Sequence, residues 1–339
     1  MKIFIPFKIK DIGGTATFVK KFSTAVEKKG LSVSRDFSFD FDILFIVGDC
    51  PLSQYFQSLF IAKILKKRII QRLDGIYTSS SSVGKLYWLY NLKIKIIHNY
   101  FADFVVYQSH YSKSAWETIC RKKKKNWTVI YNGVDTEKIR PNEKGQQESA
   151  PIKLLTFGQF RRKDQIKPLI ESVKLLEPRD YSFDIYGTYT NNLKSIFSNP
   201  ENIPNIHFHG KLSNENLLQK IIEYDIFLFS DQSACPNSVI EAMAAGLPVI
   251  AFERGSINEL ITSGYNGYVV KAKQHNPFRD SYPFTSESFN DFSRSIENII
   301  PNLKQYKESS RLVAEKRFHL DASVDEYIKI FKSYDETHH

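Results

Sequence analysis

Residues 233–246 combine, in one short segment, residue types that can bind a diphosphate. The segment reads Ser-Ala-Cys-Pro-Asn-Ser-Val-Ile-Glu-Ala-Met-Ala-Ala-Gly and follows an apolar run at residues 226–229 that predicts a buried strand. A helix is expected from Asn237 or Ser238 to Gly246. In an α/β sheet, a loop from the carboxyl end of a strand into a helix lies in the ligand crevice, and the free helix amides suit phosphate oxygens. The candidate binding residues here are Ser233, Asn237, Ser238, Val239 and Glu241.

Glu241 also has a purely structural interpretation. Ser238 and Glu241 have the spacing of a capping box, in which the Glu side chain does no more than accept from a backbone amide at the start of the helix. The segment taken alone supports ligand binding and capping equally.

The basic run Arg161-Arg162-Lys163 is a second group with evident chemistry. It follows a predicted strand at residues 153–157 and Gly158. Arg can hold phosphate oxygens bidentately, whereas Lys acts as a point charge. Fixed cations in a site without water stabilise the negative charge that develops on a leaving group. We therefore expect Arg162 and Lys163 to be catalytic and Arg161 to bind the same anion; the alternative is a solvated turn.

Asp74 is the best candidate carboxylate in the first half of the chain. It stands at the end of a predicted strand, directly before Gly75. Sites in parallel α/β sheets lie at strand ends, which favours a role as a polar contact or base for a hydroxyl group. The alternative is an Asp-Gly turn in which the side chain bonds its own backbone.

The cysteines predict neither a metal site nor a disulfide framework. Cys50, Cys120 and Cys235 are far apart and have no ligand spacing.

Lys8 and Lys10 interrupt the apolar start of the chain before a signal peptide could form, and no later run reaches the roughly 18 apolar residues of a membrane helix. We expect a cytoplasmic protein.

Strands and helices that alternate along the chain must position these residues. In the first half, strands are predicted at residues 2–7, 43–47, 69–73, 104–107 and 128–131, and helices from Gly13-Gly14 and at residues 54–65, 85–101 and 113–119. In the second half, strands are predicted at residues 153–157, 183–186, 206–209, 226–229, 248–252 and 268–270. Such alternation is typical of a parallel, doubly wound sheet.

The segment Pro141-Asn-Glu-Lys-Gly-Gln-Gln-Glu-Ser-Ala-Pro151 separates the two halves and has the composition of a linker. We expect domains at residues 1–140 and 152–321, with a C-terminal helix at about residues 322–336 packed back on the first. At 339 residues, two domains are also the natural expectation from length.

Positive charge is concentrated in the first domain. Residues 1–140 hold 24 Lys and Arg against 11 Asp and Glu, which is +13, and the total of +10 leaves −3 for the remainder. The densest clusters are residues 63–68 and Arg121-Lys-Lys-Lys-Lys125. Such a charge distribution predicts an anionic partner, whereas each cluster alone is equally typical of a solvated helix end.

Taken together, four segments resemble family 4 of the GT-B glycosyltransferases in content and order. They are the glycine loop Gly13-Gly14; Val129-Ile-Tyr-Asn-Gly-Val-Asp135 followed by Ile139-Arg-Pro141; the basic loop Phe157-Gly-Gln-Phe-Arg-Arg-Lys163; and Glu241-Ala-Met-Ala-Ala-Gly-Leu-Pro-Val-Ile250 followed by Gly255-Ser-Ile-Asn-Glu259. The resemblance is strong in the second half and thin in the first. It implies two Rossmann-like domains facing a cleft, with Gly13 and Gly14 at the donor site.

The resemblance also implies the chemistry. The expected reaction moves a hexose from a UDP- or GDP-linked sugar to a glycan or lipid-linked acceptor, with retained configuration and without a metal or bound cofactor. Glu241 is expected to bind the donor ribose, and Arg162 and Lys163 to face the diphosphate. The basic domain is expected to dock on anionic membrane at the inner face of the cell membrane, and no nucleic acid partner is expected.

Three departures from the family pattern lie in the same segments. Ser233 stands where the family usually has Glu, Gln159 where it commonly has Arg, and residues 71–75 where it frequently has His. Two other classes therefore stay open: a non-catalytic binding protein with a degenerate GT-B fold, and a basic membrane- or nucleic-acid-surface protein.

Overall fold

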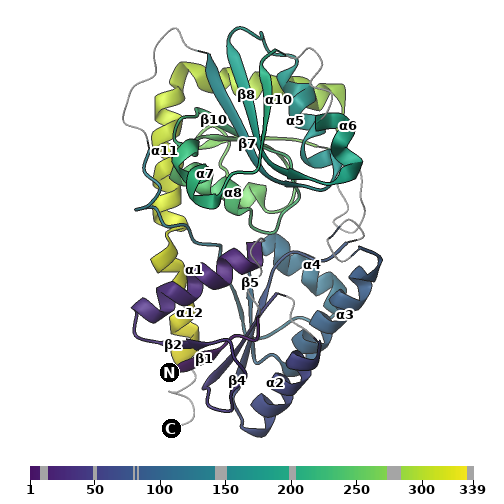
Figure 1. Cartoon of the computed structure of the whole chain (residues 1–339), viewed down its shortest axis with the longest axis vertical. Coiled ribbons are helices and arrows are strands. Elements are labelled where there is room, and N and C mark those ends of the chain that lie inside the picture. The colour runs from purple at the N-terminus through teal and green to yellow at the C-terminus, as the bar shows by residue number, and fades with distance from the viewer. Residues whose placement is uncertain are drawn as a thin grey trace. The chain divides into compact units, whose positions relative to one another are not determined.

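The chain divides into two compact units (Figure 1). Unit 1 is Met1–Gly133 with Leu320–His339, and unit 2 is Val134–His319. The computed structural model describes residues 1–7, 14–48, 52–78, 81, 84–141, 151–197, 204–272 and 284–333, without the side chains of residues 52–55 and 197. Gly13, Cys50 and most of the linker expected at residues 141–151 therefore lie outside the described residues.

Unit 1 is built on a parallel six-stranded sheet with strand order β2-β1-β3-β4-β5-β6. The central strands β3 and β4 are buried along their whole length, as expected for a sheet covered on both faces. The chain winds one way from β1 to β2 and the other way from β3 onwards, so the switch point lies between β1 and β3. The strands are β1 (Lys2–Phe4), β2 (Ser32–Ser34), β3 (Ile43–Val47), β4 (Arg68–Leu73), β5 (Phe104–Tyr107) and β6 (Trp127–Val129).

Helices cover both faces of the unit 1 sheet, because successive residues of β3 point to opposite sides. Phe45 packs in one core with α1 (Gly14–Lys28) and α12 (Leu320–Lys332). Leu44 and Ile46 pack in the other core, with α2 (Leu52–Ile64), α3 (Tyr87–Ile96) and α4 (His110–Cys120). Figure 1 shows α1 and α12 on one side of this sheet and α2 and α3 on the other.

The last helix of the chain completes the core of unit 1. In α12, Tyr327 and Phe331 contact Phe22 and Phe45 with ring centroids between 5.2 and 6.2 Å apart. Lys29 also pairs with Asp325 at 2.7 Å. Residues 320–332 thus close a core that the first 133 residues leave open.

The helix expected at residues 85–101 has three parts: a 3₁₀ turn at Gly84–Leu86, α3, and a π-helical turn at Ile97–Phe101. His98 in the π turn is fully buried. Its Nε2 lies 3.0 Å from the Tyr107 hydroxyl and its Nδ1 lies 2.7 Å from Asn99 Oδ1. Burial lowers the pKa of His98. The wider turn therefore places a neutral, hydrogen-bonded histidine in the core.

Unit 2 repeats the architecture with strand order β12-β11-β10-β7-β8-β9, again all parallel. Its first strands β7 and β8 are longer than predicted. The strands are β7 (Ile152–Phe160), β8 (Tyr181–Tyr189), β9 (Ile206–Gly210), β10 (Ile226–Phe229), β11 (Val249–Phe252) and β12 (Gly267–Val270). The expected pair of doubly wound α/β units is confirmed.

The helices of unit 2 include α8 (Asn237–Ala244), which connects β10 to β11, and α11 (Leu303–Arg317). Arg311 of α11 donates to the carbonyl oxygens of Thr136 and Ile139 at 2.9 and 2.5 Å. These bonds attach residues 134–141 to unit 2. The other helices are α5 (Lys167–Val173), α6 (Lys194–Phe197), α7 (Asn214–Ile221), α9 (Ile257–Leu260) and α10 (Ser286–Ile299). Among the described residues, no helix has both the length and the apolar character needed to span a membrane.

Candidate functional site

The carboxyl ends of three neighbouring strands of unit 2 hold the main candidate site. The chain passes from β7 to β8 and β9 on one side and then to β10 on the other, so the switch point lies between β7 and β10. Ligands of open α/β sheets bind outside the strand ends at such a point. The residues that follow β7, β10 and β11 meet there: Arg161 to Asp164, Ser230 to Ser233, and Arg254 with Gly255.

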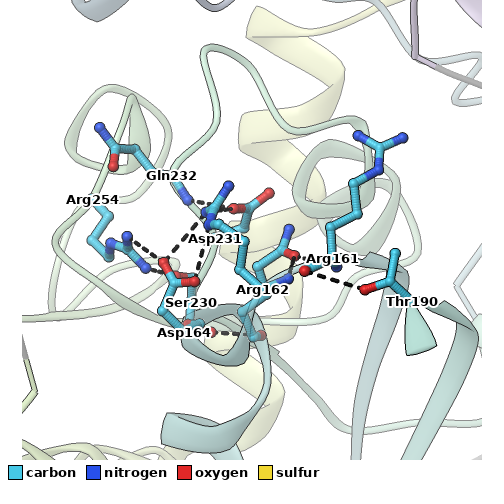
Figure 2. A network of polar contacts seen from close by, with 9 residues as sticks. Arg161, Arg162, Asp164, Thr190, Ser230, Asp231, Gln232 and Arg254 are labelled. Carbon is cyan, nitrogen blue, oxygen red and sulfur yellow. Dashed lines mark hydrogen bonds and ion pairs between the residues drawn. The ribbon is translucent and has the colours of Figure 1, made fainter. Parts of the chain in front are cut away.

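Two arginines and two aspartates form a charge network at this edge (Figure 2). Arg162 Nε donates to Asp164 Oδ1 at 2.9 Å, and its Nη2 donates to Asp231 Oδ1 at 2.8 Å. Arg254 Nη2 donates to Asp164 Oδ2 at 2.6 Å. The side chains are mostly buried, with exposed fractions of 22% for Arg162, 10% for Asp164 and 1% for Arg254. The network is neutral overall and joins the ends of all three strands.

The ionisation of this network follows from its pairing. Burial alone raises the pKa of Asp164, but Arg162 and Arg254 outweigh burial and hold that pKa below its usual value. Burial likewise lowers the pKa of Arg162, and the carboxylates of Asp231 and Asp164 outweigh it, so the pKa rises. At neutral pH, Asp164 is therefore an anion and Arg162 a cation.

Backbone hydrogen bonds fix the same loops. Ser230 Oγ donates to the carbonyl oxygens of Asp164 and Gln165 at 3.0 and 2.7 Å, and Arg254 Nη1 donates to Ser230 O at 2.9 Å. Gln165 Oε1 accepts from the amides of Arg161 and Arg162 at 2.6 and 2.9 Å. The basic loop is thus held in one conformation before any ligand binds.

The structure gives the three residues of the basic loop different surroundings. Arg162 is turned onto Asp164 and Asp231, as described above. Lys163 is exposed, and within the described part of the chain no carboxylate pairs with it. Arg161 is half-buried, and its guanidinium bonds Gln159. Lys163 and, next to it, Arg161 are the cations of this loop that an incoming anion can meet first.

The α8 segment lies at the same edge. The N-cap of α8 is Pro236, and no side-chain hydrogen bond caps the helix. Ser238 is therefore the second helical residue, not the N-cap, so Ser238 and Glu241 do not form the capping box that the spacing allowed. Glu241 is 6% exposed. Capping does not account for a buried carboxylate at this position.

The other residues predicted in this segment differ in access. Ser233, Asn237 and Ser238 are partly exposed, whereas the Val239 side chain is fully buried, which leaves only its backbone for a ligand. Ser233 accepts through its carbonyl oxygen from the amide of Ser256 at 3.0 Å. Gly255 makes this contact possible because it has a φ of +60°, and a Cβ there would lie 2.3 Å from Ser233 O.

A second polar cluster lies at the carboxyl edge of the unit 1 sheet, around Asp74. Asp74 Oδ1 accepts from Gln108 Nε2 at 2.6 Å and from Arg72, and Oδ2 accepts from Thr15 at 2.8 Å. The side chain is 26% exposed. Its backbone oxygen accepts from Ser112 Oγ and Trp116 Nε1, both at 2.8 Å. The carboxylate thus binds other segments, not its own Asp-Gly turn.

Arg72 orients Asp74 from within the core of unit 1. Its Nη2 donates to Asn132 Oδ1 at 2.6 Å, its Nε donates to the Tyr327 hydroxyl at 3.1 Å, and its guanidinium lies 3.6 Å from the centroid of Phe18. Gly14 begins α1, one residue before Thr15. The sequence singled out Asp74 and Gly14, and the structure brings both to one edge of unit 1.

Four residues of the unit 2 site were not predicted from the sequence: Asp164, Ser230, Asp231 and Arg254. Each follows a strand or the basic run directly, and a search for charged residues just after each predicted strand would have found Asp231 and Arg254. Their pairing could not be read from the sequence, because Arg254 lies 90 positions from Asp164.

The described residues contain no cluster of His, Cys, Asp and Glu that could hold a metal ion. Cys120 and Cys235 are buried, and neither forms a disulfide within the described residues. Burial raises the pKa of Cys120 to about 12, which makes it a poor nucleophile.

Part of the chain matches a known protein family, and curated relatives share about a quarter of their residues with it over the aligned regions. Residues 136–281 match the family model described as glycosyl transferases group 1. An uncharacterized 41.2 kDa protein in the cps region of Klebsiella pneumoniae is 25% identical over 217 residues, which are 61% of this chain and 55% of that protein. An uncharacterized glycosyltransferase of Methanocaldococcus jannaschii is 26% identical over 287 residues, 79% of this chain and 68% of its own.

Solved structures share the fold across the whole chain. The structure of Anabaena Alr3699/HepE in complex with UDP has a TM-score of 0.73 at 14% identity and covers 98% of this chain and 99% of its own. The lipopolysaccharide glycosyltransferase WaaG has a TM-score of 0.67 at 14% identity, covering 98% of this chain and 100% of its own. These likenesses establish the GT-B architecture.

Proposed function

Because residues 136–281 match the glycosyl transferases group 1 model and the chain has the GT-B fold, we propose that it transfers a hexose from a UDP- or GDP-linked donor to a hydroxyl of a glycan or lipid-linked acceptor. The observation that carries the proposal is the convergence of the basic loop, the α8 N-terminus and Glu241 at the switch point of the unit 2 sheet. The UDP complex of the Anabaena structure supports a nucleotide-linked donor.

The proposed donor site divides the nucleotide between two groups of residues. Glu241 accepts from the ribose hydroxyls, which suits a buried carboxylate on the first turns of α8. The diphosphate lies at the α8 N-terminus, near Ser233, Asn237 and Ser238, where backbone amides and the helix dipole attract it. Both groups come from the short connection between β10 and β11.

The proposed rate acceleration comes from charge on the departing diphosphate. As the bond from the sugar to phosphate breaks, negative charge grows on the phosphate oxygens, and Lys163 with Arg161 meets that charge. Arg162 is a positioning residue in this account, since Asp164 and Asp231 already occupy its guanidinium. We propose that the sugar keeps its anomeric configuration and that no metal ion takes part.

We assign the acceptor hydroxyl to Asp74 of unit 1. Among the described residues, only Thr15 donates to Asp74 Oδ2, so this oxygen can accept a further hydrogen bond. Arg72 and Gln108 hold the other oxygen and keep the carboxylate in place. Asp74→Asn removes the charge and keeps the shape, and we expect it to lower turnover while leaving nucleotide binding unchanged.

Donor turnover tests the proposal. Purified protein is incubated with UDP- and GDP-hexoses and candidate acceptors, and release of the nucleoside diphosphate is measured. Release of the nucleoside diphosphate that depends on the donor, and that Lys163→Ala strongly reduces, supports the proposal. A non-catalytic GT-B binding protein is the second candidate, because Ser233 carries no charge at a position where the related pattern has Glu. Tight nucleotide binding without release from any donor would favour that candidate.

A further inference from the structure

Two neighbouring helices of unit 1 have an apolar surface that faces away from the protein. On α2, Phe56, Phe60 and Ile64 are spaced four residues apart and are 50, 67 and 61% exposed. On α3, Trp88, Leu89 and Leu92 are 57, 42 and 43% exposed. We name these six residues the α2–α3 face.

The two helices lie side by side. α2 connects β3 to β4, and α3 precedes β5, so the two helices cover adjacent strands on one side of the sheet. Both contribute to one core, through Leu59 and Ala62 of α2 and Ile94 of α3. Figure 1 shows them along the same side of unit 1. The two helices therefore cover the same side of the unit 1 sheet.

The distribution of apolar residues on α2 differs from that of an ordinary surface helix, because α2 is apolar on both its buried and its exposed side. A surface helix normally carries polar residues opposite its apolar stripe, and a helix that is apolar all round is normally buried. α2 buries Leu59 and Ala62 and also exposes two phenylalanines and an isoleucine. Contiguous exposed apolar surface of this kind marks a site of interaction with a protein or a membrane.

The lysines around the α2–α3 face favour an anionic partner. The sequence from residue 52 to residue 67 and from residue 84 to residue 101 contains no Asp or Glu but six Lys. Lys66, Lys85 and Lys95 have no carboxylate partner among the described residues, whereas Lys63 pairs with Asp103 at 3.2 Å and Lys67 with Asp42 at 3.9 Å. A second copy of this chain bound through the same face would bring like charges together across a two-fold axis.

We propose that the α2–α3 face docks the protein on an anionic lipid bilayer. Aromatic and aliphatic side chains of such a face enter the boundary between headgroups and acyl chains, while the lysines meet lipid phosphates. Trp88 belongs to a residue type that is enriched at this boundary. This inference rests on the proposed function with a lipid-linked acceptor, because docking would place unit 1 at the membrane in which such an acceptor lies.

The structure also separates this face from the basic run at Arg121–Lys125, to which the charge pattern alone would assign the contact. Lys122 Nζ and Lys124 Nζ donate to the carbonyl oxygens of Asn99 and Ala102 at 3.0 and 2.5 Å. These bonds satisfy carbonyl groups at the end of the π turn, as cations at helix C-termini do. Part of that run therefore has an intramolecular role.

Vesicle sedimentation of the full chain tests the proposal. Vesicles of phosphatidylcholine alone are compared with vesicles that also contain phosphatidylglycerol. We expect binding to the mixed vesicles and little to the neutral ones. Some binding should persist in high salt, because apolar contacts are not screened as surface charges are. Binding that is absent from both vesicles, or that high salt abolishes completely, would overturn the proposal.

Matched variants locate the contact. Phe60→Ser with Trp88→Ser should weaken binding to the mixed vesicles at least tenfold, since each removes a large apolar side chain from the bilayer. Leu175→Ser is the control, because Leu175 is 53% exposed in unit 2. Equal binding of the Phe60 and Trp88 double variant and the wild type would contradict the α2–α3 face.

Charge reversal provides the second comparison. Lys66→Glu, Lys85→Glu and Lys95→Glu together should weaken binding on the order of 100-fold, at about fivefold for each basic residue near an anionic surface. The control reverses Lys167, Lys194 and Lys211 of unit 2 and keeps the net charge equal. Equal losses in both triple variants would show that only overall charge matters.

Two further readouts keep the result interpretable. A cooperative thermal unfolding transition shows that each variant is folded, and because nucleotide binding is assigned to unit 2, a failure of the donor proposal leaves the vesicle result intact. Sedimentation equilibrium reports the oligomeric state. The wild type could instead be a dimer that does not bind vesicles. If the Phe60→Ser and Trp88→Ser double variant were then a monomer, the face would be assigned to contact with a second copy.

Discussion

At the carboxyl end of β7, Arg162 and Lys163 lie in different electrostatic surroundings. Arg162 is mostly buried between two carboxylates, whereas Lys163 is exposed and pairs with no carboxylate of the described residues. A cation that is already paired inside the protein contributes mainly to the shape of the site. An unpaired cation is available to a charge that forms during the reaction.

Lys163→Ala should therefore mainly lower the catalytic rate, whereas Arg162→Ala should mainly lower the stability of the fold. Lys163→Ala should lower kcat on the order of 100-fold with the melting temperature unchanged. Arg162→Ala should lower the free energy of unfolding by about 3 kcal/mol, because it breaks a mostly buried ion pair and leaves Asp231 without this partner. Steady-state kinetics and thermal unfolding of both variants check this. Equal loss of stability in both would contradict the division of roles.

Asp164 predicts a specific dependence of stability on pH. Its pKa is held below the usual value in the folded state, so its ion pairs contribute stability above the unfolded pKa, and this contribution is lost as pH falls through the folded pKa. Asp164→Asn should thus destabilise the protein at neutral pH, and its difference from wild type should shrink below about pH 4. Urea unfolding of both proteins from neutral to acid pH measures it. A difference independent of pH would exclude this origin.

Glu241→Gln tests the ribose contact without a change of side-chain volume. A hydrogen bond to a charged acceptor contributes about 1.5–3 kcal/mol, so nucleotide affinity should fall at least tenfold while the unfolding transition stays cooperative. Isothermal titration with UDP and GDP measures the affinity. Glu253→Gln is the control, because Glu253 is exposed near the same edge of the sheet. Unchanged affinity in Glu241→Gln would remove Glu241 from the donor site.

At the scale of elements, the loops after β10 and β11 depend on a close backbone approach. Gly255 and Gly264 both have positive φ, +60° and +82°, but a Cβ at Gly255 would lie 2.3 Å from Ser233 O, whereas a Cβ at Gly264 meets no atom within 4 Å. Both glycines need a left-handed backbone conformation, but only Gly255 lies too close to another backbone segment for a side chain.

Alanine at each glycine separates these effects. Gly264→Ala should cost only the backbone strain of a left-handed residue, about 1–2 kcal/mol. Gly255→Ala should cost more and also weaken nucleotide binding, because it displaces the Ser233 loop. Unfolding free energies and nucleotide titrations of both variants give the comparison. Equal stability and intact binding in the two variants would show that the contact is not needed.

The sequence predicted most strands because apolar runs between turn residues are a local signal. The predicted bounds of β3, β5 and β10 agree with the structure residue for residue. β2 was not predicted, since a three-residue edge strand at Ser32–Ser34 has no apolar pattern. The π turn at Ile97–Phe101 was also missed, because His98 is placed by a hydrogen bond to Tyr107 of another element.

The candidate site was predictable only in part, for a similar reason. Residue types and motif spacing selected Glu241, Arg162, Lys163 and Asp74. Whether a charged side chain faces a ligand or a partner depends on residues far away in the chain, such as Arg254 opposite Asp164 and Arg72 beside Asp74. The sequence therefore identified the elements of the site but not which of its cations is free.

At the scale of the whole molecule, the two units differ in charge and in proposed role. Most of the excess Lys and Arg lies in the first 140 residues, which form most of unit 1. Unit 1 carries the α2–α3 face and Asp74, and unit 2 carries the neutral ion-pair network at its switch point. We thus assign membrane docking and acceptor binding to unit 1 and donor chemistry to unit 2.

We propose that unit 2 binds a nucleotide-linked sugar at the carboxyl edge of its sheet, and thermal unfolding with a panel of nucleotides and nucleotide sugars measures this binding. A ligand at 100 times its dissociation constant stabilises the folded protein by about 2.7 kcal/mol. We predict that a UDP- or GDP-linked sugar raises the melting temperature of the wild type and raises that of Glu241→Gln much less. No stabilisation by any nucleotide, or equal stabilisation of both proteins, would contradict the account.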